Sequence, residues 1–192
     1  MVWQDRLDPD PARPAMTQLT SARYSRGVRV FHWLTVLLIA GAYVTVNVRT
    51  LLEKGTPERT LVMQSHFLFG LAVLLVALPR IVSRLGSKAP PIQPPPPDWM
   101  HRAGHLTHGL LYAFIIVQPL LGLVAGLVEG GVGLPGGLRI PELFGPDKAL
   151  SHDLKAIHVW LGTAFYYVIG LHILAALFHL WVRRDNTLQR ML

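Results

Sequence analysis

Cysteine is absent from the 192-residue sequence. Disulfide bonds, iron–sulfur clusters, thiolate zinc sites and covalently attached c-type haem all depend on cysteine sulfur, so the sequence excludes them. Charge is also scarce, because Asp, Glu, Lys and Arg make up 15% of the residues, against about a quarter in soluble domains. This composition argues against an ordinary soluble domain.

Long apolar runs are what the chain has in abundance. Hydrophobic residues make up 51% of it, and the mean hydropathy is +0.37. About 20 helical residues cross the ~30 Å hydrocarbon core of a bilayer. Four runs approach or exceed that length: Val30–Val48, Leu61–Leu78, Leu106–Val128 and Ile157–Val182. The sequence therefore predicts an all-α integral membrane protein built as a bundle of four transmembrane helices.

The net charge of +7 is distributed unevenly between the two ends of such a bundle. Residues 1–29, the connection after the second run and the C-terminal tail share one end and carry twelve basic residues, against six at the other end. Lys and Arg concentrate on the cytoplasmic side of membrane proteins. We therefore expect both termini to be cytoplasmic, and the basic excess needs no nucleic acid to explain it.

The hydrophilic segments divide the chain into two parts. Residues 1–22 contain several prolines and no apolar core, which predicts a flexible cytoplasmic tail before a membrane domain over residues 23–192. Pro94–Pro97 predict an extended strap between the second and third helices. The Gly- and Pro-rich segment 129–155 is long for a bundle connection and predicts a periplasmic loop.

Histidines within the apolar runs require polar partners or ligands. Fourteen residues separate His158 from His172, so both leave one face of the last helix, ~21 Å apart along its axis. His32 lies at the same depth as His172, and His66 lies at the depth of His158. Two bis-histidine sites stacked across a bundle predict two b-type haems, a better fit than zinc or copper sites, which need further ligands. The alternative is that these histidines cap helix ends or form hydrogen bonds inside the bundle.

Small residues accompany the two expected periplasmic ligands. Gly70 follows His66 by four residues, and Gly162 follows His158 by four, so each lies one turn along the same face. A haem macrocycle pressed between helices needs such missing side chains. Close helix packing through glycine explains any single one of them equally well.

Three further histidines lie toward the expected cytoplasmic end. His105 and His108 share a face at the start of the third helix, and His179 follows His172 on nearly the same face. Together they predict a pocket for haem propionates or a quinone head group, whose reduction requires protons. The alternative is that these rings lie in the hydrated headgroup region, where water satisfies them. His101 and His152 fall in expected loops and suggest no specific role.

These features resemble the bacterial cytochrome b561 family of small di-haem membrane cytochromes. The resemblance covers residues 23–192 and rests on YSRGVRVFHWL (24–34), HLTHGLLY (105–112), LKAIHVWLG (154–162), VIGLHILAALFH (168–179) and RRDNTLQRML (183–192). It implies axial haem ligands at His32, His66, His158 and His172. It also implies a superoxide oxidase, in which superoxide gives electrons at the periplasmic haem and ubiquinone receives them near the cytoplasmic haem.

Basic residues at the periplasmic end suit an anionic substrate. Lys155 precedes His158 by three residues, and Arg49 closes the first helix on the same side, so both are expected to steer superoxide. Anchoring at the membrane interface is the alternative role for such residues.

Other functions of a four-helix cytochrome stay open from the sequence. One is an electron-transfer subunit that anchors a periplasmic dehydrogenase or hydrogenase, although a protein partner is not required. A six-helix ascorbate-dependent ferrireductase exceeds the four spans available, and a proton-relaying transporter would lack haem absorbance. The absence of a nucleotide-binding fingerprint argues against a second built-in redox cofactor.

Overall fold

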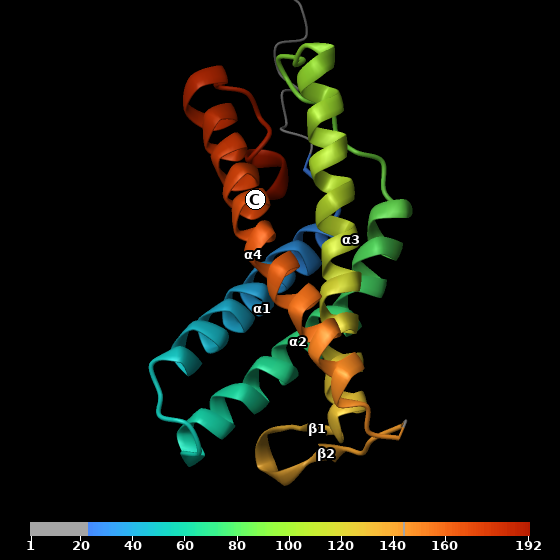
Figure 1. The fold of residues 1–192 in the computed structure, drawn as a ribbon. Coiled ribbons are helices and arrows are strands. Elements are labelled where there is room, and N and C mark those ends of the chain that lie inside the picture. The colour runs from blue at the N-terminus through green and yellow to red at the C-terminus, as the bar shows by residue number, and fades with distance from the viewer. Residues whose placement is uncertain (1–22, 144) are drawn as a thin grey trace, which may run out of the picture.

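The computed structural model describes residues 23–143 and 145–192, so the expected tail of residues 1–22 lies outside the described part. Four long helices dominate it (Figure 1). They are α1 (Arg26–Thr50), α2 (Pro57–Leu85), α3 (Asp98–Glu129) and α4 (Lys148–Phe178), and α4 continues through a π turn, η2 (His179–Arg183). Each of the four is long and apolar enough to cross a membrane, which confirms the predicted four-span helical bundle.

Local sequence signals set the helix ends. Thr56 caps α2 by accepting a hydrogen bond from the Arg59 amide, and Pro57 occupies the first turn, where its missing N–H costs nothing. Asp147 caps α4 in the same way through the Leu150 amide. Gly130 ends α3 at φ 137°, a backbone conformation that residues with a Cβ rarely adopt. Two of the four spans therefore begin at side-chain N-caps.

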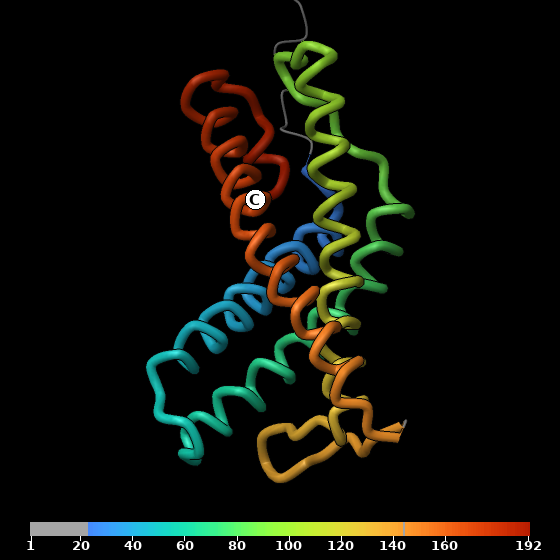
Figure 2. Tube along the Cα trace, in the orientation of Figure 1, coloured from blue at the N-terminus to red at the C-terminus, as the bar shows by residue number. Residues whose placement is uncertain are grey.

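The helices associate as two pairs. Figures 1 and 2 show α1 and α2 running antiparallel and inclining away from α3, which α4 crosses. Val73 and Ala77 of α2 pack on Phe114 and Ile115 of α3 to form the central buried cluster. Phe165 of α4 stacks on Phe114 with ring centroids 4.0 Å apart, so α4 joins the same core.

Few side chains are buried between the spans. In the described part of α4 only Ser151 is fully buried, and large apolar side chains face outward, for example Leu37 and Tyr167 at 68% and 78% exposure. A bilayer satisfies such an apolar exterior.

Both ends of the bundle carry ordered connections. The C-terminal segment, with the short helix η3 (Gln189–Met191), folds back so that the Tyr24 amide donates to the Arg190 carbonyl at 2.9 Å and the Gln93 amide to Asn186 Oδ1 at 2.8 Å. The N-terminal segment, the proline strap and the tail therefore lie at one end, as the charge distribution requires. The other end carries an antiparallel hairpin of β1 (Val132–Gly133) and β2 (Arg139–Ile140), joined through η1 (Pro135–Gly137).

The helices extend beyond the apolar runs, and this corrects three expectations. The helix α2 continues past Pro79 to Leu85, because an internal proline removes one hydrogen bond but leaves the others intact. The helices α3 and α4 begin at Asp98 and Lys148, so His101 and His152 are helical rather than in loops, and the loop at 129–155 is shorter than expected. Hydropathy detects only the part of a helix that lies in lipid.

Candidate functional site

Two histidines lie opposite each other at the end where α1 begins and the C-terminal segment folds back. His32 extends from α1 and His172 from α4, with ring centroids 6.4 Å apart and planes inclined by 65°. Two imidazoles that bind one iron from opposite sides have ring centres about 6.4 Å apart, from a metal–nitrogen bond of about 2.0 Å and about 1.2 Å from nitrogen to ring centre on each side. The observed separation suits two imidazoles that bind the same metal ion.

A second pair lies toward the hairpin end. His66 of α2 and His158 of α4 have ring centroids 6.1 Å apart and perpendicular planes. The structure thus brings together both pairs that depth alone predicted. Among the described residues, no three His, Asp or Glu side chains gather as a metal site, so the donor sets suit a metal whose other ligands come from a macrocycle.

Backbone carbonyls orient the two rings of the hairpin-end pair. His66 Nδ1 lies 2.9 Å from the Ala42 carbonyl oxygen, and His158 Nδ1 lies 3.0 Å from that of Gln118. A carbonyl only accepts, so each Nδ1 carries the ring proton and each neutral ring presents the lone pair of Nε2. Such carbonyl partners typically fix metal-binding histidines.

Gln118 and Gly122 of α3 lie against His158, and the sequence pattern did not identify Gln118. Gln118 Nε2 donates to the His158 carbonyl at 2.8 Å, and a Cβ at Gly122 would lie 2.9 Å from the ring carbon Cε1. The sequence signal that could have identified Gln118 is its position inside an apolar run, where a polar side chain needs a partner. Gly70 opens onto empty space, as a macrocycle would need, whereas a Cβ at Gly162 would lie 3.0 Å from Gln118 Nε2.

The three histidines expected to converge make separate contacts. His108 lies beside His172, with centroids 5.5 Å apart. The ring of His105 instead contacts that of His101, with centroids 4.5 Å apart. His179 Nδ1 lies 2.6 Å from Asp185 Oδ2 in the C-terminal segment.

Asp185 organises that C-terminal segment. It is 2% exposed and accepts hydrogen bonds from His179, from Arg183 Nε at 3.1 Å and from the Thr187 amide at 3.0 Å. Burial alone would raise the pKa of its carboxyl, but the hydrogen bonds from Thr187, His179 and Arg183 outweigh it and hold the pKa below its ordinary value. Asp185 is therefore ionised, and its hydrogen bonds join the end of α4 to the C-terminal tail.

An Asp185→Asn variant is expected to lose about 1–3 kcal/mol of stability, because hydrogen bonds to a buried charge are replaced by neutral ones. A carboxyl with a lowered pKa stabilises the fold above its unfolded pKa, and the stabilisation disappears as pH falls through the folded value. Thermal unfolding in detergent at pH 7 should show a lower Tm than wild type, and the difference should begin to shrink only as pH falls below about 4, the unfolded pKa of an aspartate. The exposed Asp153→Asn is the control, and equal Tm values for both variants would contradict the prediction.

Cations at the hairpin end line two open hollows. Arg49 and Arg59 border one of about 380 Å³, together with Gln64 and with Met63 and Phe67, which bracket His66. Arg59 is held in place by donating to the Arg49 and Leu52 carbonyls at 3.0 and 2.5 Å.

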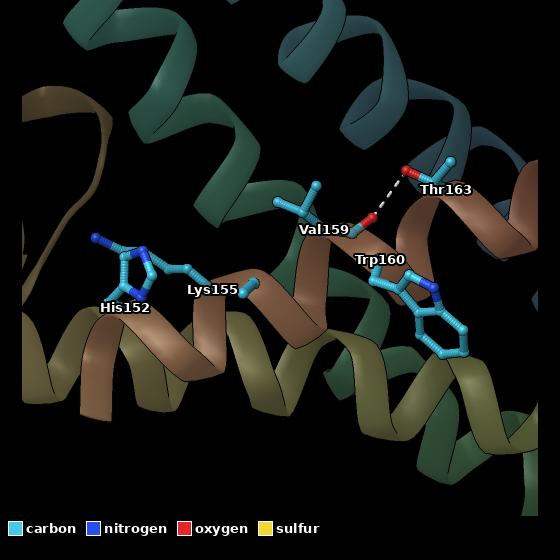
Figure 3. Close-up of a pocket in the computed structure, with 6 residues that line it drawn as sticks. His152, Lys155, Val159, Trp160 and Thr163 are labelled. Atoms are coloured by element: carbon cyan, nitrogen blue, oxygen red, sulfur yellow. Dashed lines mark hydrogen bonds between the residues drawn. The ribbon is translucent and has the colours of Figure 1, made fainter. Parts of the chain in front are cut away.

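The second hollow, of about 570 Å³, runs along α4. Lys155, Trp160 and Thr163 are among its lining residues, as Figure 3 shows. Lys155 forms an ion pair with Glu129 of α3. Its positive charge is therefore partly offset, whereas Arg49 forms no ion pair with any described residue.

Comparison with known proteins agrees with this architecture. The family model described as prokaryotic cytochrome b561 matches residues 23–192. Cytochrome b561 homolog 1 of Escherichia coli K12 is 31% identical over 88% of this chain and 97% of its own length. The probable superoxide oxidase CybB of Yersinia pestis is 34% identical over 84% of this chain and 90% of its own. With four membrane-spanning helices and paired histidines between them, the chain belongs to the prokaryotic cytochrome b561 family, whose members are electron-transfer proteins with b-type haem.

Proposed function

We propose that the protein is a di-haem superoxide oxidase that passes electrons from superoxide to ubiquinone across the bacterial inner membrane. The observation that carries the proposal is the presence of two facing histidine pairs, with centroids 6.4 and 6.1 Å apart, at different depths of one bundle. Both chain termini face the cytoplasm in this proposal, in line with the excess of basic residues at that end.

Four side chains of this protein hold the cofactors. His66 and His158 bind the outer haem, and His32 and His172 bind the inner one. Bound haem supplies one-electron carriers at the two depths. The protein contributes ring orientation, through the Ala42 and Gln118 carbonyls at the outer pair.

Superoxide reacts at the outer end. Each superoxide anion gives up one electron and leaves as O₂. The hollow bordered by Arg49 and Arg59 reaches the α2 residues on either side of His66, so it offers an anion a positively charged approach to the outer pair. Lys155 adds to this field, although its pairing with Glu129 weakens its contribution.

Ubiquinone is reduced at the inner end, where two electrons and two protons convert it to ubiquinol. His108 lies against His172 and supplies a hydrogen-bond donor for a quinone carbonyl. His179, fixed through Nδ1 by Asp185, offers its Nε2 for proton transfer. His105 lies nearer than His108 to the start of α3. It is exposed and contacts the exposed His101, so it connects that region to solvent.

Optical spectroscopy of the purified oxidised protein tests the function. Enzymatically generated superoxide is expected to reduce the haems rapidly, and added ubiquinone should reoxidise them. Catalase in the assay removes hydrogen peroxide, so peroxide cannot be the species that reduces the haems. A protein whose spectrum shows bis-histidine haem but whose haem stays oxidised in the presence of superoxide would contradict the proposal. It would favour an electron-transfer subunit that receives electrons from a protein donor.

Two opposite charge changes at the outer end test the steering role. Arg49→Gln is expected to slow haem reduction by superoxide about two- to tenfold at low ionic strength, whereas Glu129→Gln should accelerate it by freeing Lys155. Both effects should shrink in salt, since screening acts over ~8 Å at physiological ionic strength. Stopped-flow absorbance measures the rates. Arg84→Gln makes the same charge change at the opposite end, and equal rates for all variants would exclude steering.

A further inference from the structure

Arg80 carries a positive charge inside α2 and has no anionic partner among the residues that the structure describes. The residue is half-buried, and α2 continues beyond it through Leu85, so it belongs to the helix rather than to a hydrated loop. None of the carboxylates in residues 23–143 and 145–192 lies within ion-pair distance of its guanidinium. Its Nε is buried and has no hydrogen-bond partner in the described part of the chain. Such a charge within a membrane span requires compensation.

The present contacts of Arg80 compensate this charge poorly. One terminal nitrogen lies 3.4 Å from both the Phe31 and His32 carbonyl oxygens, longer than the 2.7–3.2 Å typical of N–H···O bonds. The other lies 3.1 Å from His32 Nδ1. The guanidinium also lies 5.4 Å from the centre of the Tyr112 ring. These groups are neutral, so none of them compensates the charge, and the terminal nitrogens of the guanidinium can still donate to a charged acceptor.

The contact with His32 conflicts with haem binding. A guanidinium only donates, so His32 Nδ1 must accept, and the single proton of the neutral ring then occupies Nε2. A histidine that binds iron through Nε2 has its proton on Nδ1 instead, as His66 and His158 do through their carbonyl partners. Arg80 must therefore release His32 and take another acceptor when the inner haem binds.

We propose that this acceptor is a propionate carboxylate of the inner haem. The inference rests on the proposed function, because it assumes a haem between His32 and His172. A b-type haem carries two carboxylates, and a guanidinium fork binds a carboxylate through two parallel hydrogen bonds. A carboxylate also neutralises the half-buried charge, which a neutral quinone carbonyl does not.

The Arg80→Gln variant of the full-length holoprotein tests the proposal through the haems themselves. Loss of a nearby cation stabilises the oxidised iron, so one of the two midpoint potentials should fall while the other keeps its wild-type value. Loss of the charged hydrogen bonds should speed transfer of one haem to apomyoglobin about 10- to 100-fold. Arg84→Gln, one turn further along α2, makes the same charge change and should alter neither property.

A conservative variant separates this role from a general effect on folding. Arg80→Lys keeps the charge, so it should retain a near-wild-type potential, but it should release the haem faster than wild type because a point charge replaces the fork. Unchanged potentials and haem transfer in Arg80→Gln would overturn the proposal. A changed dependence on ubiquinone concentration alone would also overturn it and assign Arg80 to the quinone.

The wild-type measurement distinguishes this failure from a failure of the proposed function. Two midpoint potentials in the wild type support the di-haem assignment whatever the Arg80 variants do. A wild-type protein with a single haem contradicts that assignment. The Arg80 inference then depends separately on whether Arg80→Gln moves the potential of that haem.

Discussion

A His172→Ala variant is expected to contain one haem per chain and to lose superoxide-driven ubiquinone reduction by at least about 100-fold. Loss of the outer-shell partner of a metal ligand already costs about 10- to 100-fold in affinity or activity, and loss of the ligand itself costs no less. Removal of this imidazole would leave His32 alone on α1, because His108 lies beside His172 rather than opposite His32. Superoxide should still reduce the haem between His66 and His158.

Haem per chain, the optical spectrum and the quinone reduction rate measure this outcome together. Lys88→Ala removes an exposed side chain near the same end of the bundle and should leave all three unchanged. Two haems per chain in His172→Ala would contradict the assignment of His172. A single haem with full ubiquinone reduction would place the quinone elsewhere.

The converse effect is expected of His66→Ala, which should lose the outer haem and about 100-fold or more of the rate of superoxide oxidation. The variant also leaves the Ala42 carbonyl without its imidazole donor, which costs about 1–3 kcal/mol of stability. The inner pair keeps its geometry, because His32 and His172 lie on α1 and α4 and the substitution lies on α2.

Chemical reduction distinguishes this loss from general damage. Dithionite-reduced His66→Ala should still pass electrons to ubiquinone through the inner haem, although superoxide no longer reduces the protein. His152→Ala, an exposed change toward the same end, is the control and should react with superoxide as wild type does. Rapid reduction of His66→Ala by superoxide would show that the electrons enter at a different site.

Local signals explain why much of the fold is readable from the chain. Apolar runs as long as Leu106–Val128 can only be satisfied by lipid or by a large core, and the backbone in lipid must be helical. Helical geometry then converts sequence spacing into depth. The alternating direction of the helices therefore predicted that His32 would meet His172 and that His66 would meet His158, and the ring separations agree.

Contacts between segments far apart in the chain were not readable in this way. The second apolar run ends at Leu78, so hydropathy places Arg80 in the connection that follows, whereas the helix continues to Leu85 and Arg80 lies beside His32. His179 lies on nearly the same face of its helix as His172, yet it forms its contact with Asp185 because the tail folds back on α4.

The membrane class, the four spans and the depths of the paired histidines follow from hydropathy and helical rise, which act along the chain. Tertiary contacts set which carbonyls orient the rings, which of the described cations are paired, and where Arg80 lies. Those outcomes depend on how helices incline and on which side chains meet across them. Spacing along one helix carries no information about such contacts.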